Sequence, residues 1–265
     1  MKALLSGPNG NLGDQIQKFA DFKVQPIHRG EWEDYSSKSL AGFHTFIHCA
    51  YDLKNTIHEQ PAKVIDSNLL TTMKALEICK ENNIPNFLFI SSCSVYGHSS
   101  KTTESTACNP ITINGLTKLL NERIILSFCK ENKIKPIILR AFNSYGGNDE
   151  FSIISKLIKA SKSGETFKLY NGGLAERDFI HITDLAKIVC QFSITPPEPS
   201  IMNIGTGEST RIINIVKYFE KKFGKFKIES RKNLEEVAFS RADITKLKNE
   251  IEFKFLNIYE CIDCL

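Results

Sequence analysis

The stretch KALLSGPNGNLGDQIQKFA, residues 2–20, decides the fold. An apolar run leads into Gly7, Gly10 and Gly13, spaced as G-x-x-G-x-x-G, and an amphipathic stretch follows. Glycines in such a turn let the backbone approach a pyrophosphate closely, and the N-terminus of the next helix offers unpaired N–H groups. An ordinary strand-to-helix turn is the alternative, but the position between a predicted strand and a predicted helix favours a dinucleotide-binding turn.

Strand and helix patterns alternate over the first 142 residues. Apolar runs predict strands at 22–28, 44–50, 87–92 and 135–142, and longer periodic stretches predict helices at 64–83 and 115–132. The first of these helices carries one apolar stripe, and the second is expected to bury another; the stripes are Ile65, Leu69, Met73, Leu76 and Cys79, then Leu116, Leu119, Leu120, Ile124 and Phe128. This alternation predicts an α/β fold of the Rossmann type, a doubly wound parallel sheet with helices on both faces.

The pattern becomes less regular from about residue 145. Helices are predicted at 151–164 and 211–224, and a strand at 225–230. We therefore expect a dinucleotide-binding domain at 1–145, to which a segment at about 178–206 returns. Residues 146–265 would then form mainly a small C-terminal substrate-binding lobe.

Composition narrows the class of protein. Of 265 residues 42% are hydrophobic, and 34 Lys and Arg stand against 30 Asp and Glu without forming a single basic block. This argues against a nucleic-acid partner, and no stretch is long and apolar enough for a membrane span or a signal peptide. Eight cysteines without a secretory signal are expected to be reduced thiols, six histidines show no metal spacing, and a cytoplasmic protein is predicted.

The end of the second predicted strand bears on the cofactor. An acidic residue there binds the adenosine ribose of NAD, whereas an arginine accommodates the 2′-phosphate of NADP. Here His28 is followed by Arg29. NADP is therefore slightly favoured over NAD.

Five further motifs follow the glycine turn in a characteristic order. They are FISSCSVYG (89–97), NPITINGLTK (109–118), LRAFNSYG (139–146), RDFIHITDLA (177–186) and NIGTGEST (203–210). In order and spacing the chain resembles the extended short-chain dehydrogenase/reductases, specifically the NAD-dependent epimerase/dehydratase family that acts on nucleotide-activated sugars.

The resemblance implies roles for the residues that match. A sugar oxygen would be bound by Ser92, the nicotinamide ribose by Lys118, and the sugar nucleotide by Asn143 and Arg177. The remaining cofactor contacts implied are Gly7, Gly10, Asn11, Leu12, Gly13, Ala50 and Asn68. The two helices at 64–83 and 114–133 resemble those with which the family forms a homodimer.

Some positions depart from the family pattern. Cys93 and Ser94 stand where the dehydratase branch has an Asp-Glu pair, which argues against water elimination. The segment from Arg29 to the next strand is short, as in the deoxysugar-reductase branch. The usual substrate arginine near residues 242–246 is absent, although Arg231 or Arg241 could replace it.

The largest departure is Asn114. The family pattern is Tyr-x-x-x-Lys, and the residue four positions before Lys118 is Asn114, which cannot exchange a proton in the working pH range. The sequence leaves three explanations open: an active epimerase or keto-reductase in which Tyr96, Tyr145, Cys93 or a relayed water serves as acid or base; a catalytically silent dinucleotide- or nucleotide-sugar-binding partner or sensor; or an introduced substitution that traps a substrate complex.

Overall fold

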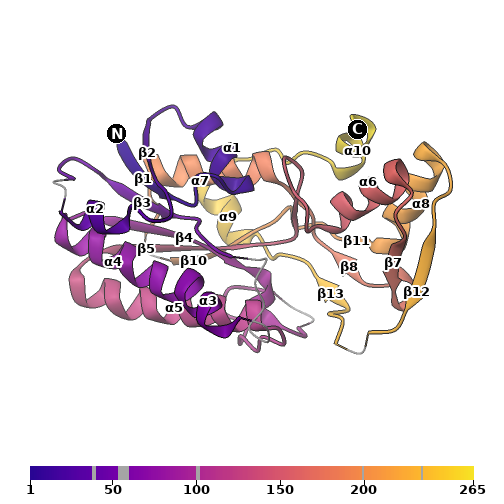
Figure 1. The fold of residues 1–265 in the computed structure, drawn as a ribbon, viewed down its shortest axis with the longest axis horizontal. Helices are drawn as coiled ribbons and strands as arrows, with labels where there is room; N and C mark the ends of the chain where they lie inside the picture. The colour runs from indigo at the N-terminus through magenta and orange to yellow at the C-terminus, as the bar shows by residue number, and fades with distance from the viewer. Residues whose placement is uncertain (38–39, 53–59, 100–101, 199, 234) are drawn as a thin grey trace.

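The computed structural model describes residues 1–265 except 38–39, 53–59, 100–101, 199 and 234. It has two parts, a larger α/β layer structure that contains the N-terminus and a smaller lobe beside it (Figure 1). The chain passes from the first part to the second after β5, which ends at Ala141.

A six-stranded parallel sheet forms the centre of the larger part, in the order β10-β5-β4-β3-β1-β2. The strands are β1 (Lys2–Ser6), β2 (Lys23–Ile27), β3 (Thr45–His48), β4 (Asn86–Ser92), β5 (Lys135–Ala141) and β10 (Ser200–Ile204). The chain leaves β1 toward β2 and then returns to the other side of β1 with β3, so the direction of winding reverses between β1 and β3. In open parallel sheets, ligands bind at the carboxyl ends of the strands next to such a reversal.

Helices cover both faces of the sheet, which confirms the predicted fold class. Alternate strand residues point to opposite faces, so Leu5, Ile47 and Leu88 pack on one side, and Leu4 and Phe46 on the other. The first face is covered by α1 (Asn11–Phe19), α7 (Ile182–Ile194) and α9 (Thr245–Glu250), and the second by α2 (Trp32–Ser37), α4 (Thr71–Glu81) and α5 (Ile113–Asn132).

The predicted helix at 64–83 is interrupted. It consists of α3 (Pro61–Ile65), a π-helical turn η1 (Asp66–Leu70) and α4, and the N–H of Thr71 bonds back to Asp66 O. A π-turn adds a residue to the repeat, so the positions before and after it no longer share one face. Leu76 and Cys79 are therefore buried, while Ile65, before the turn, is exposed. Met73 is also exposed, because it lies off the buried face that Thr72, Leu76 and Cys79 form within α4.

The predicted inward face of the second long helix is correct only in part, because Leu119, Ile124 and Phe128 are partly buried against the core while Leu116 and Leu120 are not. In α5, Leu116 and Leu120 are 43% and 44% exposed, and the buried side chains include Lys118, Asn121 and Glu122. Hydrophobic periodicity failed at the start of α5 because the buried positions there are polar, whereas Ile125 and Cys129 bury an apolar face further along the helix.

The smaller lobe has its own apolar core and short strands. Its main helices are α6 (Ile153–Ser163), α8 (Ile212–Phe223) and α10 (Ile258–Asp263), and the core includes Leu157, Phe219 and Ile262. The helices predicted at 151–164 and 211–224 are confirmed, as is the strand at 225–230, which forms β12 (Ile228–Arg231). The other strands and short helices outside the central sheet are β6 (Ser144–Tyr145), β7 (Phe167–Tyr170), β8 (Glu176–Arg177), β9 (Ile180–His181), β11 (Thr210–Arg211), β13 (Phe239–Ser240), η2 (Cys93–Tyr96) and η3 (Asn171–Gly173).

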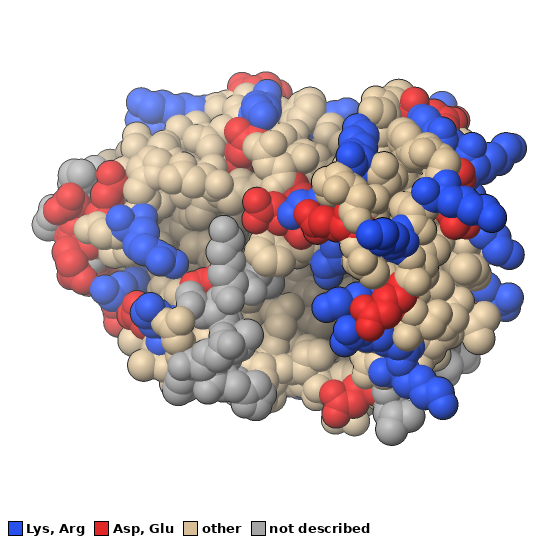
Figure 2. All heavy atoms as spheres, turned by 45° about the vertical axis from the view of Figure 1, so that its right-hand side comes forward, with Lys and Arg blue, Asp and Glu red and all other residues tan. Residues whose placement is uncertain are grey.

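Charged side chains of both signs are scattered over the face shown in Figure 2, and lysine and arginine are more frequent over the small lobe. Within the described part of the chain, no helix has the length and hydropathy that crossing a lipid bilayer requires.

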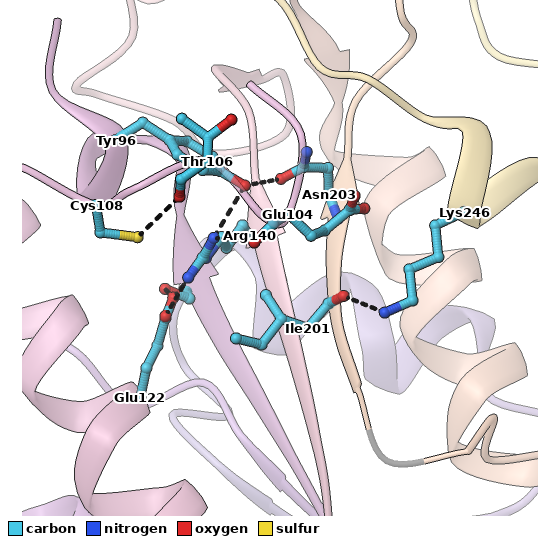
Figure 3. Close-up of polar contacts among 10 residues, drawn as sticks. Tyr96, Glu104, Thr106, Cys108, Glu122, Arg140, Ile201, Asn203 and Lys246 are labelled. Atoms are coloured by element: carbon cyan, nitrogen blue, oxygen red, sulfur yellow. Dashed lines mark hydrogen bonds and ion pairs between the residues drawn. The ribbon is translucent and has the colours of Figure 1, made fainter. Parts of the chain in front are cut away.

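A buried polar network fixes α5 against the sheet (Figure 3). Arg140 of β5 donates to both carboxylate oxygens of Glu122 in α5, at 3.0 and 2.7 Å, and both side chains are almost completely buried. Arg140 also donates to Tyr96 Oη at 3.0 Å, and this hydroxyl donates to Asn203 Oδ1 at 2.6 Å. The Ser91 hydroxyl donates to Glu122 Oε1 at 2.5 Å, so strands β4, β5 and β10 share one network with α5.

Removing one member of this buried pair is expected to destabilise the protein strongly. Arg140→Met leaves the Glu122 carboxylate buried without its cation, which costs about 3–5 kcal/mol of unfolding free energy. The double variant Arg140→Met/Glu122→Leu removes both charges and should be more stable than the single variant. Urea unfolding of the parent protein, the single variant and the double variant measures their free energies of unfolding. A double variant no more stable than the single one would contradict the interpretation.

Candidate active site

The glycine turn between β1 and α1 forms the start of the site. Gly7 has φ of 73°, and a Cβ there would lie 2.8 Å from the backbone nitrogen of Ala50, so only glycine fits. Gly10 caps α1, and the first bond of the helix runs from Asp14 N–H to Gly10 O at 2.9 Å. The backbone N–H groups that precede this bond in the first turn have no partner inside the helix. They therefore point out from the helix N-terminus, as binding of an anionic pyrophosphate requires.

The side chains of the turn fasten it to the rest of the molecule. Asn11 Nδ2 donates to Gly146 O at 2.9 Å, and its Oδ1 accepts from Asn148 N–H at 2.9 Å. Leu12 packs against the core under the sheet, and Gly13 is buried. Their backbones, rather than these side chains, are the groups suited to a cofactor.

A buried chain of hydrogen bonds between two hydroxyls and an imidazole supports the backbone that packs against the glycine turn. Ser6 Oγ lies 2.6 Å from His48 Nδ1, and His48 Nε2 lies 3.0 Å from Thr72 Oγ1. Ser6 Oγ also accepts from the N–H of Ala50 at 3.3 Å, which places Ala50 against Gly7. Burial, and secondarily the charge of Lys118, lowers the pKa of His48 to about 3.

Asn68 holds the loop that follows β3. Its Oδ1 accepts from Asp52 N–H at 2.7 Å and its Nδ2 donates to Asp52 O at 3.1 Å. The Asp52 carboxylate in turn lies 3.9 Å from Arg29 Nη2, and the Arg29 side chain is 84% exposed after the end of β2. The structure thus brings Arg29, Asp52 and Asn68 together, with both groups of the Asn68 amide directed to backbone.

Ser92 and Lys118 lie at the carboxyl end of β4. Ser92 Oγ caps the 3-10 turn η2 by accepting from Ser94 N–H at 3.1 Å, and Ser94 Oγ donates to it at 2.9 Å. Lys118 Nζ donates to Ile90 O at 2.7 Å, two residues before Ser92. Burial lowers the pKa of Lys118 from 10.5 to about 7, against smaller opposing effects of Cys49 and Glu122.

Asn114 lies in the first turn of α5, beside this strand end. Thr112 caps the helix by accepting from Gly115 N–H at 3.1 Å, and a side chain at Gly115 would meet the carbonyl oxygen of Ser94. Only a glycine allows the helix start to lie so close to η2. The Asn114 side chain is exposed, one helical turn before Lys118.

The tyrosines and the cysteine considered as replacement acids lie in unsuitable surroundings. The Tyr96 hydroxyl is engaged by Asn203 and Arg140, and burial raises its pKa to about 12. Burial likewise raises the pKa of Tyr145 and of the Cys93 thiol. None of the three groups is suited to exchanging a proton near neutral pH.

Arg177 lines a cavity of about 440 Å³ between the lobe strands and the C-terminal segment 255–259. Its Nη1 donates to Glu176 O at 2.8 Å, and its Nη2 lies 3.8 Å from Glu236. Neighbouring Asp178 is fully buried and accepts from Thr206 N–H and Gly207 N–H, both at 2.9 Å, which shapes the cavity wall. Asn143 Nδ2 donates to Asp178 O at 2.8 Å and therefore links β5 to this wall.

Sequence reasoning missed His48, Tyr51 and Asp178. Tyr51 Oη lies 2.5 Å from Thr117 Oγ1, and its ring lies under Lys118 Nζ. His48 ends β3 and Tyr51 follows it at the carboxyl edge of the sheet, and Asp178 lies in the motif at 177–186. These positions could have identified the three residues. Across the described ranges, no three or more His, Cys, Asp or Glu side chains are grouped as a metal site would require.

The fold, and the residues gathered at the carboxyl edge of the sheet, define a Rossmann-type α/β protein with a second lobe over the carboxyl ends of its strands. The model of the NAD dependent epimerase/dehydratase family matches residues 10–205, and the chain belongs to that family.

Named relatives agree with this assignment. Protein CapI of Staphylococcus aureus is 28% identical over 224 residues, which are 74% of this chain and 66% of CapI. The uncharacterized UDP-glucose epimerase YtcB of Bacillus subtilis is 30% identical over 156 residues, 58% of this chain and 49% of YtcB. The matched part thus spans about half to two thirds of these relatives.

A solved structure shows the same fold over nearly the whole chain. UDP-glucuronic acid 4-epimerase from Bacillus cereus, in complex with UDP-glucuronic acid and NAD, has a TM-score of 0.85 and 24% identity. The match covers 98% of this chain and 96% of that one, so the small lobe is included in the similarity.

The buried His48 should make stability depend on pH. Its folded-state pKa of about 3 lies below the ordinary 6.5, so the unfolded state binds more protons below pH 6.5. The stabilisation is complete above pH 6.5 and is lost as the pH falls toward 3, by about 1.4 kcal/mol per pH unit. Urea unfolding at pH 7 and pH 5 should show a smaller loss for His48→Gln than for the parent; equal losses would refute the assignment.

Proposed function

We propose that this protein binds NAD or NADP and acts on a nucleotide-activated sugar, as an epimerase that passes through a keto intermediate or as a keto-sugar reductase. The observation that carries the proposal is the position of Lys118. Its buried ammonium lies at the carboxyl end of β4, at the same edge of the sheet as the glycine turn. An anion-binding helix end and a buried cation at one crevice suit a dinucleotide.

The chain's residues divide the work of binding. The first-turn amides of Asn11, Leu12 and Gly13 would hold the pyrophosphate, since Gly7 leaves the close approach open. Ala50 and the loop fixed by Asn68 would line the cofactor, and Lys118 would bind the nicotinamide ribose. The bound dinucleotide would supply hydride transfer at nicotinamide C4, and Ser92 would orient the reacting sugar oxygen.

Arg29 is the residue that would decide between NAD and NADP. Its exposed guanidinium is suited to a 2′-phosphate, whereas the adjacent Asp52 carboxylate would repel one. The Bacillus cereus structure contains NAD, and this supports NAD. Arg29 and Asp52 have opposite effects on a 2′-phosphate, so comparing the affinities for NADH and NADPH measures which of the two charges dominates.

A nucleotide diphosphate is the substrate group that the lobe would recognise. Arg177 lines the cavity, and an arginine fork matches diphosphate oxygens. The relatives named as UDP-sugar epimerases support this substrate class. Asn143 would act by holding the Asp178 wall rather than through a free amide.

Asn114 favours a second candidate function. We infer that Asn114 occupies the position of the family tyrosine, and its amide can bind a substrate oxygen but cannot exchange a proton. A binding partner or sensor without turnover would keep the cofactor and sugar contacts and lack the chemistry.

The cofactor proposal predicts a specific effect of Lys118. Mass spectrometry of small molecules released on denaturation, followed by titration of the stripped protein with NADH and NADPH, should reveal dinucleotide binding. Lys118→Ala should weaken it about 10- to 100-fold, because a charged hydrogen bond is lost. Lys130→Ala, on the same helix but exposed, is the control and should bind normally. Failure of the parent protein to bind either dinucleotide would defeat the proposal.

We also propose a homodimer formed through α4 and α5. Large apolar side chains are exposed along this face, namely Ile65, Leu70, Met73, Ile113, Leu116 and Leu120. Contiguous exposed apolar surface on a soluble protein marks an interaction site.

Charges placed on this face should separate the subunits. Leu116→Glu/Leu120→Glu is predicted to halve the mass measured by light scattering, because carboxylates would be buried in the interface. Leu174→Glu changes an apolar residue that is 65% exposed on the small lobe, away from this face, and should leave the mass unchanged. A monomeric mass for the unaltered protein would exclude the dimer.

A further inference from the structure

The Tyr51 hydroxyl lies at the start of α5, beside the residue that lacks an acid. Tyr51 follows β3 by three positions, at the carboxyl edge of the sheet. Its Oη is 2.5 Å from Thr117 Oγ1 and donates to Asn114 O at 3.4 Å. A phenol from a different element therefore reaches the helical turn that carries Asn114.

Lys118 lies over the ring of the same tyrosine. Its Nζ is 3.8 Å from the Tyr51 ring centroid, and 4.8 Å from that of Phe89. A cation at this distance is attracted to the ring face, and it stabilises the negative charge that a phenolate spreads over its ring carbons. Lys118 is thus placed to act on Tyr51 electrostatically without a direct contact to the oxygen.

The hydrogen bonds also favour Tyr51 as a proton donor. Thr117 Oγ1 donates to Ile113 O at 2.9 Å or Asn114 O at 3.1 Å, so its lone pairs face the Tyr51 hydroxyl. Tyr51 is only partly buried, in contrast to Tyr96 and Tyr145. Burial raises the pKa of Tyr51, and its hydrogen bond with Thr117 opposes this shift. Tyr51 therefore differs from Tyr96 and Tyr145 in its partial exposure and in its position beside Asn114, rather than in the direction of its pKa shift.

We propose that Tyr51 is the catalytic acid and base of this protein and supplies the proton-transferring hydroxyl that the Asn114 position lacks. The inference rests on the proposed function. A bound dihydronicotinamide would supply the hydride for the new C–H bond of a keto-sugar, and Tyr51 would give its proton to the oxygen as the carbonyl π bond breaks. In the reverse direction the Tyr51 phenolate would take the sugar hydroxyl proton, and the oxidised cofactor would accept the hydride from the C–H bond.

The test compares Tyr51→Phe with the parent protein, supplied with NAD and either UDP-glucose or UDP-glucuronic acid. Sugar products are resolved by NMR, reduced cofactor by absorbance, and NADH affinity by fluorescence. Tyr51→Phe keeps the ring under Lys118 and removes only the hydroxyl. It should lower kcat about 10²- to 10⁴-fold and leave NADH affinity within about twofold.

Two further variants make the result specific. Tyr170→Phe, on the exposed lobe strand β7, is the matched control and should retain parent activity. Tyr51→Phe/Asn114→Tyr places a phenol at the family position and should recover activity lost in Tyr51→Phe. Recovery would show that a missing hydroxyl, and no wider damage, caused the loss.

The outcomes separate this proposal from the proposed function. Parent-like kcat in Tyr51→Phe overturns the role of Tyr51 while the enzyme assignment stands. An inactive parent with an active Asn114→Tyr variant also overturns it, and shows that the cofactor and sugar sites are intact. If every variant binds NADH and none turns over either substrate, both the role of Tyr51 and the enzyme assignment fail, and the binding function remains.

Discussion

The Arg140–Glu122 pair is the interaction on which the arrangement of the site depends. Both charges are almost fully buried, and the guanidinium spans the carboxylate with two donors. Such a pair is strongly directional, because any other placement of α5 would leave two charges desolvated and unpaired. Glu122 lies one helical turn after Lys118, so fixing Glu122 also sets where Lys118 meets β4. The start of the helix is thus held by polar geometry, and Ile125 and Cys129 add apolar packing further along.

That polar geometry explains the two unusual faces of α5. Its inner face carries Lys118, Asn121 and Glu122, and its outer face exposes Leu116 and Leu120. A buried charge needs a partner, and here Lys118 has the Ile90 carbonyl and Glu122 has the Arg140 guanidinium. The neutral Asn121 donates to Asn68 O, and its Oδ1 has no hydrogen-bond partner among the described residues. The apolar side chains left on the outer face are the ones through which a homodimer is proposed.

The loop after β3 links the glycine turn to the start of α5. Asn68 holds the Asp52 backbone with two hydrogen bonds, and Ser6, which is bonded to His48, holds the N–H of Ala50 at the glycine turn. Tyr51 is positioned because it lies between these two fixed residues. Its hydroxyl then reaches Thr117 at the start of α5. A chain with asparagine four residues before the lysine thus still brings a phenol and an ammonium together, by a route that joins β3 to α5 instead of running along one helix.

The sequence alone determined the order of strands and helices, the glycine turn and the family motifs, because these depend on local periodicity and on backbone freedom at single residues. It also placed Ser92 at a strand end, and Asn114 and Lys118 in the first two turns of a helix. It could not show which face of α5 is buried, since the pairing of Glu122 with Arg140 overrides the apolar pattern. Nor could it show the phase change at the π-turn of residues 66–70 or the approach of Tyr51 to Thr117, which are 66 residues apart. Those features arise only when distant segments meet, because the free energy of a buried charge or hydroxyl depends on the partner that the tertiary fold provides.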